Sequence, residues 1–578
     1  MDAIVAALLR PGKSGSREVR ADLLWLGGLL LILVATGIGL RDPWPADEPR
    51  FALIARDMVA NHQWLIPSVG GDVYADKPPL FFWMIASLLT LTGSMRISFL
   101  LPSLLATAGC VVLVYDLARR LWNRETGLAA ALALLFTAQY VWQARQAQID
   151  ATLCFFTTLG LYGLLRHCLL GPDWKWYAIG WAAAGLGIIT KGVGFLPLLV
   201  LIPYAFSSRG GWMPRPAING GWRWLIGPLA LLLAVSVWLV PMLMAAQHDP
   251  ALQRYRDEIL FGQTVHRYAG AWHHREPFWY FIVNVIPGLW LPFTALLPWL
   301  IPQWREALRA RDQRIFLPLA WIVLVVLFFS LSSGKRGVYV LPAVPALAIA
   351  VAPFMASIAQ RRKAQMVVFV IVACLAVFML AGSAYMFFSP LQRHTLIDEY
   401  GVDVLMPLLA MGGAATLVCL ITRATHGFAA WGGFLAVEML IVSFMINPVI
   451  DASRSSAAFI RKVEQQTRNV SELGVVAYKE QFLLHIQRPI VNFGHARWRE
   501  AEQETADAAA WQAQKEGRVL LMDEPTRTLC FKSATARLVG IASGDRWYLV
   551  EGNGDPQCIE RGHSDTAIKY RPPALRMQ

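Results

Sequence analysis

Residues 78–93 read PPLFFWMIASLLTLTG, and the way in which this apolar run meets a membrane decides the side on which every later helix begins. The run is short, starts with two prolines and ends at Gly93. A helix needs about 20 apolar residues to cross a bilayer upright. We therefore expect residues 78–93 to lie along the membrane surface or to re-enter, and not to cross.

The rest of the chain is dominated by longer apolar runs. Its composition is 56% hydrophobic and only 16% charged, whereas soluble globular chains carry about 25% charged residues. Thirteen runs besides 78–93 predict a polytopic α-helical membrane protein. They cover residues 21–40, 97–118, 127–143, 151–170, 175–190, 192–207, 224–246, 278–301, 315–333, 338–359, 366–388, 403–422 and 428–447.

The basic loops test this interpretation of residues 78–93. If that run does not cross, the strongly basic loops fall on the same side as the N-terminus, and if it crosses they all change sides. These loops are 119–126, 208–223, 302–314 and 360–365. Lys and Arg accumulate in cytoplasmic loops, so the pattern predicts about 13 spans with a cytoplasmic N-terminus. Lys13, Arg17 and Arg20 before the first run agree with a retained first helix.

The same topology predicts two domains. Residues 1–447 form a transmembrane catalytic domain with a large outer loop at 41–96, and residues 448–578 form a soluble α/β domain on the outer side. In the tail, a hydrophilic helix-forming stretch from His495 to Lys515 lies among short β-like runs. Those runs are Leu473–Tyr478, Pro489–Phe493, Val519–Met522, Ala536–Ile541 and Trp547–Val550.

The cysteines of the tail predict a disulfide, and the net charge of the chain indicates which binding partners to expect. Cys530 and Cys558 are the two cysteines of the tail, and a single pair in an oxidising compartment predicts a disulfide. The net charge is +13, but no nucleic-acid module accompanies it. Anionic lipid head groups and phosphorylated lipids are the partners that we expect, and we expect the protein to act as a monomer.

The outer loop 41–96 carries the first candidate site residues. Asp47 and Glu48 precede Pro49 and Arg50, a pattern typical of a helix start. Asp47 has two interpretations: it caps the helix 49–60, or it is, together with Glu48, a catalytic carboxylate held above the membrane. Lys77 precedes two prolines, so its backbone is expected to be extended. It is either a lysine that reaches to the membrane surface or a cation aimed at a lipid phosphate.

Further candidates lie at the outer ends of other spans. Asp150 opens the run 151–170, either as a helix cap or as a second carboxylate facing the first loop. Arg267 belongs to a basic outer loop, and Lys335 and Tyr339 follow the run 315–333. Positive charge is normally depleted outside. Its retention there favours a phosphate-binding mouth over a merely solvated face.

Several motifs together resemble a known family. They are DEPRFALIARDM at 47–58, DKPPLFFW at 76–83, RISFLLPSLLA at 96–106, LARRLW at 117–122 and an R-x4-D pattern that ends at Asp150. The chain resembles the GT-C membrane glycosyltransferases, within them the bacterial enzymes related to protein mannosyltransferases, and in particular the lipid A aminoarabinose transferases. The resemblance covers most of the membrane part, and the tail contributes no family motif.

The resemblance implies an enzyme of the bacterial inner membrane that acts on the periplasmic side and contributes to polymyxin resistance. The implied donor is 4-amino-4-deoxy-L-arabinosyl undecaprenyl phosphate, and the implied acceptor is a lipid A phosphate. Roles are implied for Asp47, Arg50, Lys77, Asp150 and Tyr339. This chain has Asp76 where some relatives have Glu before Lys-Pro-Pro, which puts a ligand role at that position in doubt.

The chemistry of the implied reaction assigns these residues provisional roles. The donor leaves as a phosphate anion, so cations such as Lys77 and Arg267, with the Tyr339 hydroxyl, would stabilise developing charge. A phosphate acceptor needs no strong base, because its second pKa is about 6. Asp47 and Asp150 would then bind the sugar's ammonium group or a metal ion. With a hydroxyl acceptor, one of them would act as base.

Alternatives remain open at this point. If a divalent ion binds, Asp76 and His266 would be its ligands. The sugar could be carried by another polyprenyl phosphate, or the acceptor could be a protein hydroxyl. A transporter is the alternative from another class, but transport paths place ionisable residues within spans, and here the charged residues cluster at the outer ends of spans.

Overall fold

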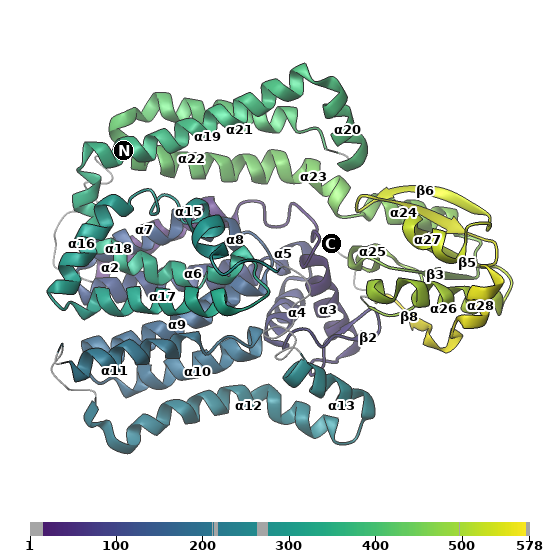
Figure 1. Cartoon of the computed structure of the whole chain (residues 1–578), viewed down its shortest axis with the longest axis horizontal. Helices are drawn as coiled ribbons and strands as arrows, with labels where there is room; N and C mark the ends of the chain where they lie inside the picture. Colours follow the sequence, from purple (N-terminus) through teal and green to yellow (C-terminus); the bar gives the residue numbers. More distant parts are fainter. Residues whose placement is uncertain are drawn as a thin grey trace.

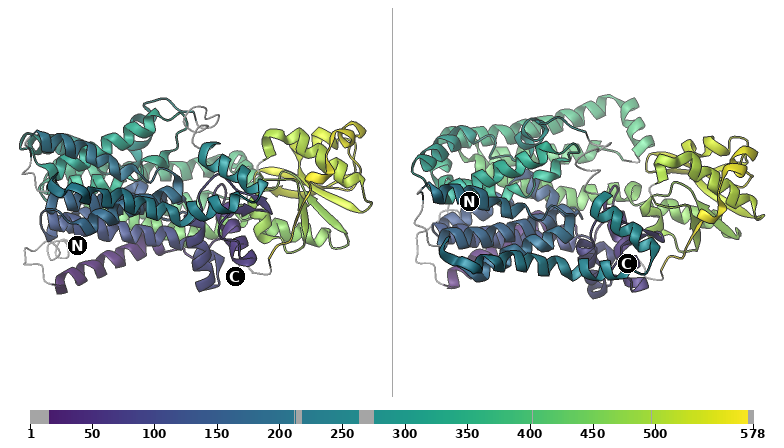
Figure 2. Two further views of the ribbon diagram at one scale, coloured as in Figure 1. Left: turned by 90° about the horizontal axis from the view of Figure 1, so that it is seen from below. Right: turned by 60° about the horizontal axis from the view of Figure 1, so that its bottom comes forward.

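The computed structural model describes residues 16–210, 212, 218–262, 275–400, 402–495 and 497–573. The molecule is elongated: a bundle of helices occupies most of its length, and a region of mixed sheet and helix lies at one end (Figures 1 and 2). The first half of the bundle contains α2 (Ser16–Leu30), η1 (Leu31–Ala35), α3 (Glu48–Asn61), α4 (Leu80–Thr92), α5 (Met95–Ser98), α6 (Leu101–Leu121), α7 (Arg124–Leu135), α8 (Ala138–Ala144), α9 (Ile149–Leu170), α10 (Trp174–Lys191), η2 (Leu196–Val200) and α11 (Leu201–Arg209).

The second half of the bundle runs from residue 218 to residue 454. It contains η3 (Ile218–Leu225), α12 (Ile226–Ala246), α13 (Pro250–Asp257), η4 (Glu258–Gly262), η5 (Phe281–Val285), α15 (Ile286–Leu289), α16 (Leu297–Arg309), α17 (Gln313–Leu331), η6 (Gly337–Val340), α18 (Ala343–Ala359), α19 (Arg362–Phe388), α20 (Pro390–Tyr400), α21 (Leu405–Thr422), η7 (Ala424–His426), α22 (Gly427–Ile441), η8 (Val442–Ile446) and α23 (Asn447–Arg454).

The helices confirm a polytopic membrane fold at a coarser level than the sequence predicts. Within the described ranges, seven helices are long and apolar enough to cross a membrane, or up to eight if the bent pair α7 and α8 forms one span. Other predicted spans are short or broken. The run 278–301 is divided into η5, α15 and the start of α16. The number of about 13 spans therefore stays a prediction.

Side-chain contacts show which loops lie at each end of the bundle. At the end where α2 begins, Arg124 Nε lies 2.8 Å from Asp22 Oδ2, and Arg314 Nη1 donates to the Leu121 carbonyl. At the other end, beside the sheet region, the loop before α3 meets the loop before α9 and the start of α23. The basic loops 119–126 and 302–314 thus share the end of the bundle at which α2 begins.

Helix α4 holds the run that decides the topology. It spans 13 residues, fewer than an upright crossing needs, and lies near the sheet end of the bundle (Figure 1). Its Phe81 ring packs edge-on against Phe51 of α3, with ring centroids 5.5 Å apart. Residues 80–92 are therefore packed against the first loop.

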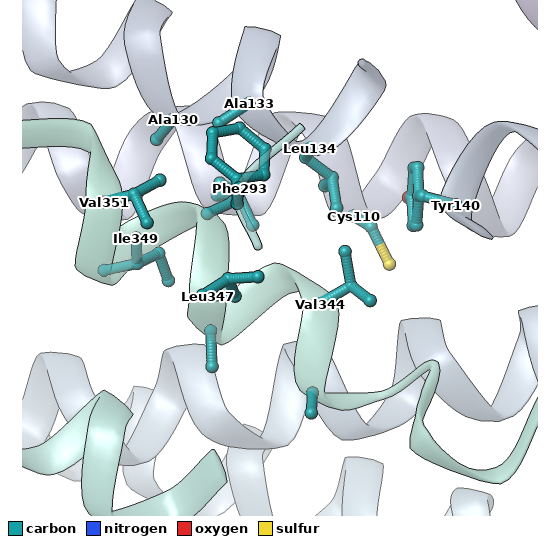
Figure 3. Close-up of a cluster of buried hydrophobic side chains, with 14 of the residues drawn as sticks. Cys110, Ala130, Ala133, Leu134, Tyr140, Phe293, Val344, Leu347, Ile349 and Val351 are labelled. Carbon is teal, nitrogen blue, oxygen red and sulfur yellow. The ribbon is translucent and has the colours of Figure 1, made fainter. Parts of the chain in front are cut away.

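The bundle is held together by close packing of small and apolar side chains. Figure 3 shows Cys110 of α6, Ala130 and Leu134 of α7, Val344 of α18 and Phe293 of the turn before α16 gathered in one cluster. Helices α9 and α10 approach so closely that a Cβ at Gly163 would lie 2.4 Å from the Trp176 carbonyl oxygen. Glycine is required there because any side chain would push the two helices apart.

The tail forms a six-stranded sheet with helices around it. The strand order is β6-β7-β5-β3-β4-β8, in which β3 runs parallel to β4 and β5 and the other pairs are antiparallel. The strands are β3 (Glu472–Val475), β4 (Ile490–Asn492), β5 (Arg518–Asp523), β6 (Ala536–Ala542), β7 (Asp545–Val550) and β8 (Ile568–Tyr570). The helices are α24 (Ala457–Gln466), α25 (Glu480–His485), η9 (Arg497–Glu500), α26 (Ala501–Ala513), α27 (Glu524–Cys530), α28 (Pro556–Arg561) and η10 (Ser564–Thr566).

The sequence predicts five of these strands and the long helix but not β8. Cys530 and Cys558 form a disulfide, as the sequence predicts.

The sheet region is fastened to α3. Arg56 donates to the Leu483 and Leu484 carbonyls of α25 and to the Tyr570 hydroxyl of β8. The same hydroxyl lies 3.0 Å from Asp57 Oδ1. The hairpin of β1 (Ser68–Val69) and β2 (Asp72–Val73) adds a bond from Asn492 Nδ2 to the Gly70 carbonyl, at 2.9 Å. The first loop therefore lies between the bundle and the sheet.

Candidate active site

Asp47 occupies the position before α3 but does not cap it. Its side chain makes no capping hydrogen bond. Instead, Asp47 Oδ2 lies 3.2 Å from Arg336 Nη1, and both side chains are partly exposed, at 22% and 41%. The interpretation of Asp47 as a simple helix cap is therefore wrong, because the carboxylate turns toward the segment that follows α17.

Glu48 has a different environment although it is the next residue. Its carboxylate pairs with the Arg41 guanidinium and accepts bonds from the backbone N–H groups of Trp44 and Ala147, each at 2.9 Å. The side chain is 9% exposed. Both oxygens are thus occupied in joining the loop before α3 to the loop before α9. This geometry suits a positioning residue better than the predicted catalytic role.

A cavity of about 330 Å³ lies beside these two carboxylates. Asp47 and Glu48 line it together with four arginines from four different segments. The arginines are Arg41, Arg145, Arg336 and Arg454. Apolar side chains from η1, α8 and η8 complete the walls. The formal charges of the lining leave an excess of two positive charges, which favours an anionic ligand.

A second group of polar side chains, outside the cavity lining, interacts with Arg336. Asp150 stands in the first turn of α9, where Gln148 occupies the capping position. Its Oδ1 forms an ion pair with Lys191 Nζ, and that nitrogen lies 4.5 Å from the centre of the Tyr339 ring. The sequence predicts Asp150 and Tyr339 separately as site residues, and Lys191, which contacts both, brings them together.

Arg336 connects the two groups electrostatically. Burial lowers the pKa of its guanidinium, but Asp47, Asp150 and Tyr339 raise it, and the pKa lies above its ordinary value. Arg336 therefore stays charged between two carboxylates. The predicted catalytic residues Asp47 and Asp150 consequently act on one shared cation.

The other predicted phosphate ligands lie apart from the cavity. Arg50 Nε is bonded to Glu480 Oε1 at 2.7 Å, so this arginine links α3 to α25. Lys335 is 5% exposed and donates to the Glu276 carbonyl at 2.7 Å. Lys77 Nζ donates to the Asp76 carbonyl at 3.1 Å.

The loop with Arg267 and His266 lies outside the described residues, so the structure does not place these two side chains. Asp76 is exposed in the loop before α4. Across the ranges that the structure describes, no group of three or more His, Cys, Asp and Glu side chains gathers as a metal site. The predicted divalent ion stays a prediction.

Sequence reasoning missed three positions in this region. Lys191 ends α10 and was treated only as a boundary between two apolar runs, although a single lysine between such runs is itself a signal. Arg145 enters the sequence prediction only as the first residue of the R-x4-D pattern, and the sequence gives no prediction for Arg41. Burial lowers the pKa of Arg145 to about 10, helped by the like charge of Arg41. Arg145 still carries its proton at neutral pH.

Known proteins are similar to this chain in sequence and in fold. The model of the dolichyl-phosphate-mannose-protein mannosyltransferase family matches residues 76–240. The undecaprenyl phosphate-alpha-4-amino-4-deoxy-L-arabinose arabinosyl transferase 1 of Pseudomonas fluorescens is 30% identical over 463 residues, which cover 77% of this chain and 80% of that protein. The corresponding transferase of Pseudomonas aeruginosa PAO1 is 33% identical over 58% of this chain and 59% of its own length.

A solved structure supports the fold. The crystal structure of ArnT from Cupriavidus metallidurans bound to undecaprenyl phosphate superposes with a TM-score of 0.72 at 20% identity, covering 93% of this chain and 98% of that chain. The same protein in the apo state gives a TM-score of 0.71. The polytopic architecture and the tail are thus both part of a known membrane-enzyme fold.

Proposed function

The chain belongs to the family of undecaprenyl phosphate-aminoarabinose arabinosyl transferases, and we propose that it transfers 4-amino-4-deoxy-L-arabinose from undecaprenyl phosphate to a phosphate group of lipid A. It is a membrane glycosyltransferase. The proposal places the reaction on the periplasmic side of the inner membrane, with about 13 spans and a cytoplasmic N-terminus. Residues 1–447 would form the catalytic domain, and residues 448–578 a periplasmic domain.

The observation that carries this proposal is the position of Arg336 between Asp47 and the Asp150–Lys191 pair. Transfer of an amino sugar between two phosphates needs cations for the phosphates and a carboxylate for the ammonium group. Asp150 is already paired with Lys191. Asp47 is partly exposed at the cavity and meets Arg336 at 3.2 Å, so Asp47 is the carboxylate that receives the sugar's ammonium group.

The reaction then follows from charge. An oxygen of the acceptor phosphate attacks C1 of the sugar, and the bond from C1 to the donor phosphate oxygen breaks with its electron pair. Undecaprenyl phosphate leaves with the added negative charge. Lys77, Lys191 and the Tyr339 hydroxyl would stabilise that charge on the donor side, together with Arg267. No proton need be removed from an ionised acceptor phosphate.

Mass spectrometry of lipid A from cells with and without the chain tests the proposal. We expect aminoarabinose on lipid A phosphate only when the chain is present. Unmodified lipid A, with a new sugar on another lipid or on protein, would favour the alternative of a different donor or acceptor.

A Lys77→Ala variant tests the donor side of the site. Loss of one donor that stabilises developing negative charge costs about 100–1000-fold in rate, so transfer by the purified variant should nearly disappear. Lys77→Arg should recover little, because a planar guanidinium does not replace a compact ammonium. Near-normal turnover of Lys77→Ala would leave this lysine as a membrane-surface anchor.

A further inference from the structure

Arg145 lines the cavity, and the hydrogen bonds that its guanidinium donates all go to neutral groups. It follows the last turn of α8 and faces the cavity. Its Nη1 donates to the Leu33 carbonyl at 2.9 Å and to the Thr36 hydroxyl at 3.1 Å. Its Nη2 donates to the Thr36 carbonyl at 2.9 Å and to the Ser443 hydroxyl at 2.6 Å. Among the described residues, no carboxylate lies within ion-pair distance of this guanidinium.

The other arginines of the cavity differ from Arg145 in this respect. Arg41 is neutralised by Glu48, and Arg336 faces Asp47. Arg454 ends α23 at the cavity rim, is exposed, and has no ion pair within the described part of the chain. Arg145 and Arg454 therefore supply the excess positive charge of the cavity. A partly buried guanidinium without a counter-ion is costly, and a bound anion would offset that cost.

The position of this cavity distinguishes two phosphates. Direct transfer needs both phosphates near C1 of the sugar. The acceptor dianion repels the donor phosphodiester, which gains a second negative charge as it leaves, so each phosphate requires its own cations. Lys191 lies 4.5 Å from the centre of the Tyr339 ring, and neither residue lines the cavity. Arg145 and Arg454 line it together with Asp47 and Arg336. The sugar's ammonium group at Asp47 would thus face a phosphate in the cavity.

We infer that the cavity beside Asp47 binds the phosphate monoester of the acceptor lipid, with Arg145 at its floor and Arg454 at its rim. This inference rests on the proposed function, because it names the acceptor side of that reaction. The apolar walls contributed by Trp142, Val442 and Ile450 suit a lipid headgroup better than free inorganic phosphate. The volume of about 330 Å³ is sufficient for a phosphosugar headgroup but not for acyl chains.

Steady-state kinetics of purified variants test this inference. Arg145→Gln should raise KM for lipid A about 10-fold or more, because a charge-assisted pair is lost, and should leave KM for the donor unchanged within about 2-fold. Arg361→Gln is the matched control, since this exposed arginine precedes α19 at the far end of the bundle. Its kinetics should equal those of the wild type.

A second variant keeps the test decisive if Arg145→Gln does not fold, since Arg145 also ties η1 to η8. Arg454→Gln removes an exposed side chain and should raise KM for lipid A about 3–10-fold, as expected for loss of a more solvated pair. Lipid A lacking phosphate should bind equally to wild type and to both variants. Inorganic phosphate should compete only weakly, and undecaprenyl phosphate should bind all proteins alike.

Three outcomes separate the possibilities. A rise in donor KM with unchanged acceptor KM would assign the arginines to the donor and overturn the inference. Equal KM values for wild type and both folded variants would reduce Arg145 to a structural bond. If the wild type modifies no lipid A at all, the proposed function fails, and binding of phosphorylated against dephosphorylated lipid A still decides whether the cavity recognises the phosphate.

Discussion

Helix α3 carries two arginine–aspartate contacts that differ in burial. At its start, Asp47 and Arg336 are 22% and 41% exposed and meet at 3.2 Å. One and a half turns from its end, Arg56 and Asp57 are 3% and 2% exposed and share the Tyr570 hydroxyl. The first pair can exchange its partners for a ligand at little cost. The second cannot lose a member without leaving a buried charge unpaired.

The surroundings of an arginine–aspartate contact therefore decide what that contact can do. The buried pair holds the sheet region against the helix that carries Asp47, and the exposed pair faces the cavity. Burial raises the pKa of Asp57 above its ordinary range although Arg56 and Tyr570 lower it. The buried contact therefore depends on Arg56, and each of the following changes tests one side of the comparison.

The largest effect is expected for Arg56→Met. The variant removes the counter-ion of Asp57 and the donor of two carbonyls of α25, and breaking a buried pair costs about 3–5 kcal/mol. We expect a lower melting temperature and faster proteolysis of residues 457–573. A fully protease-resistant variant would mean that the sheet region does not depend on this contact.

Asp47→Asn should affect turnover and leave stability unchanged. The exposed pair contributes at most about 1 kcal/mol to stability, but loss of the carboxylate removes the partner of the sugar's ammonium group. Transfer should fall about 100-fold or more, with undecaprenyl phosphate binding intact. A melting temperature that falls as far as in Arg56→Met would erase the distinction between the two pairs.

Tyr570→Phe should have a smaller effect at the buried pair. The hydroxyl bonds to Arg56 and Asp57 at once, and removal of one such group costs about 1–2 kcal/mol. The ring stays in place, so packing is preserved. Differential scanning fluorimetry should show a moderate decrease in melting temperature, and transfer at permissive temperature should stay within a few-fold of the wild type.

The sequence predicts much of this arrangement but not its contacts. Asp47 and Asp150 stand out as carboxylates in predicted outer segments next to apolar runs, and the family resemblance implies a role for Tyr339. The tail strands follow from their alternating pattern. The partners are different. Arg336 lies 289 residues from Asp47, and Tyr570 lies 513 residues from Asp57. Nothing local in the sequence links such positions. The interaction of Arg336 with two carboxylates and the bonds between Tyr570 and α3 could therefore not be predicted.

The smallest effect concerns a partly buried and a buried glutamate of the sheet region, Glu480 and Glu504, whose pKa values move in opposite directions. Burial raises the pKa of Glu480, but His495 and Arg50 lower it to about 2. Glu504 is 1% exposed, accepts a bond from the Ala477 N–H, and has no ion pair among the described residues. Burial raises its pKa to about 7. Partners, and not burial alone, therefore separate the two carboxyls.

The sign of the pH dependence follows from these values. Glu504 binds its proton more tightly when folded, so its contribution to stability is fully present below the unfolded pKa near 4.5 and is lost as pH rises through about 7. Between pH 6 and 8 the free energy of unfolding should fall by about 1 kcal/mol. Glu480 has a lowered pKa, so its contribution is present above pH 4.5 and is lost only as pH falls toward 2. The contribution of the Glu480 carboxyl to stability therefore does not change between pH 6 and 8. Glu504→Gln should flatten the melting temperature between pH 6 and 8, whereas Glu480→Gln should lower it at both values without changing its slope. A slope that survives Glu504→Gln would assign the titration to another group.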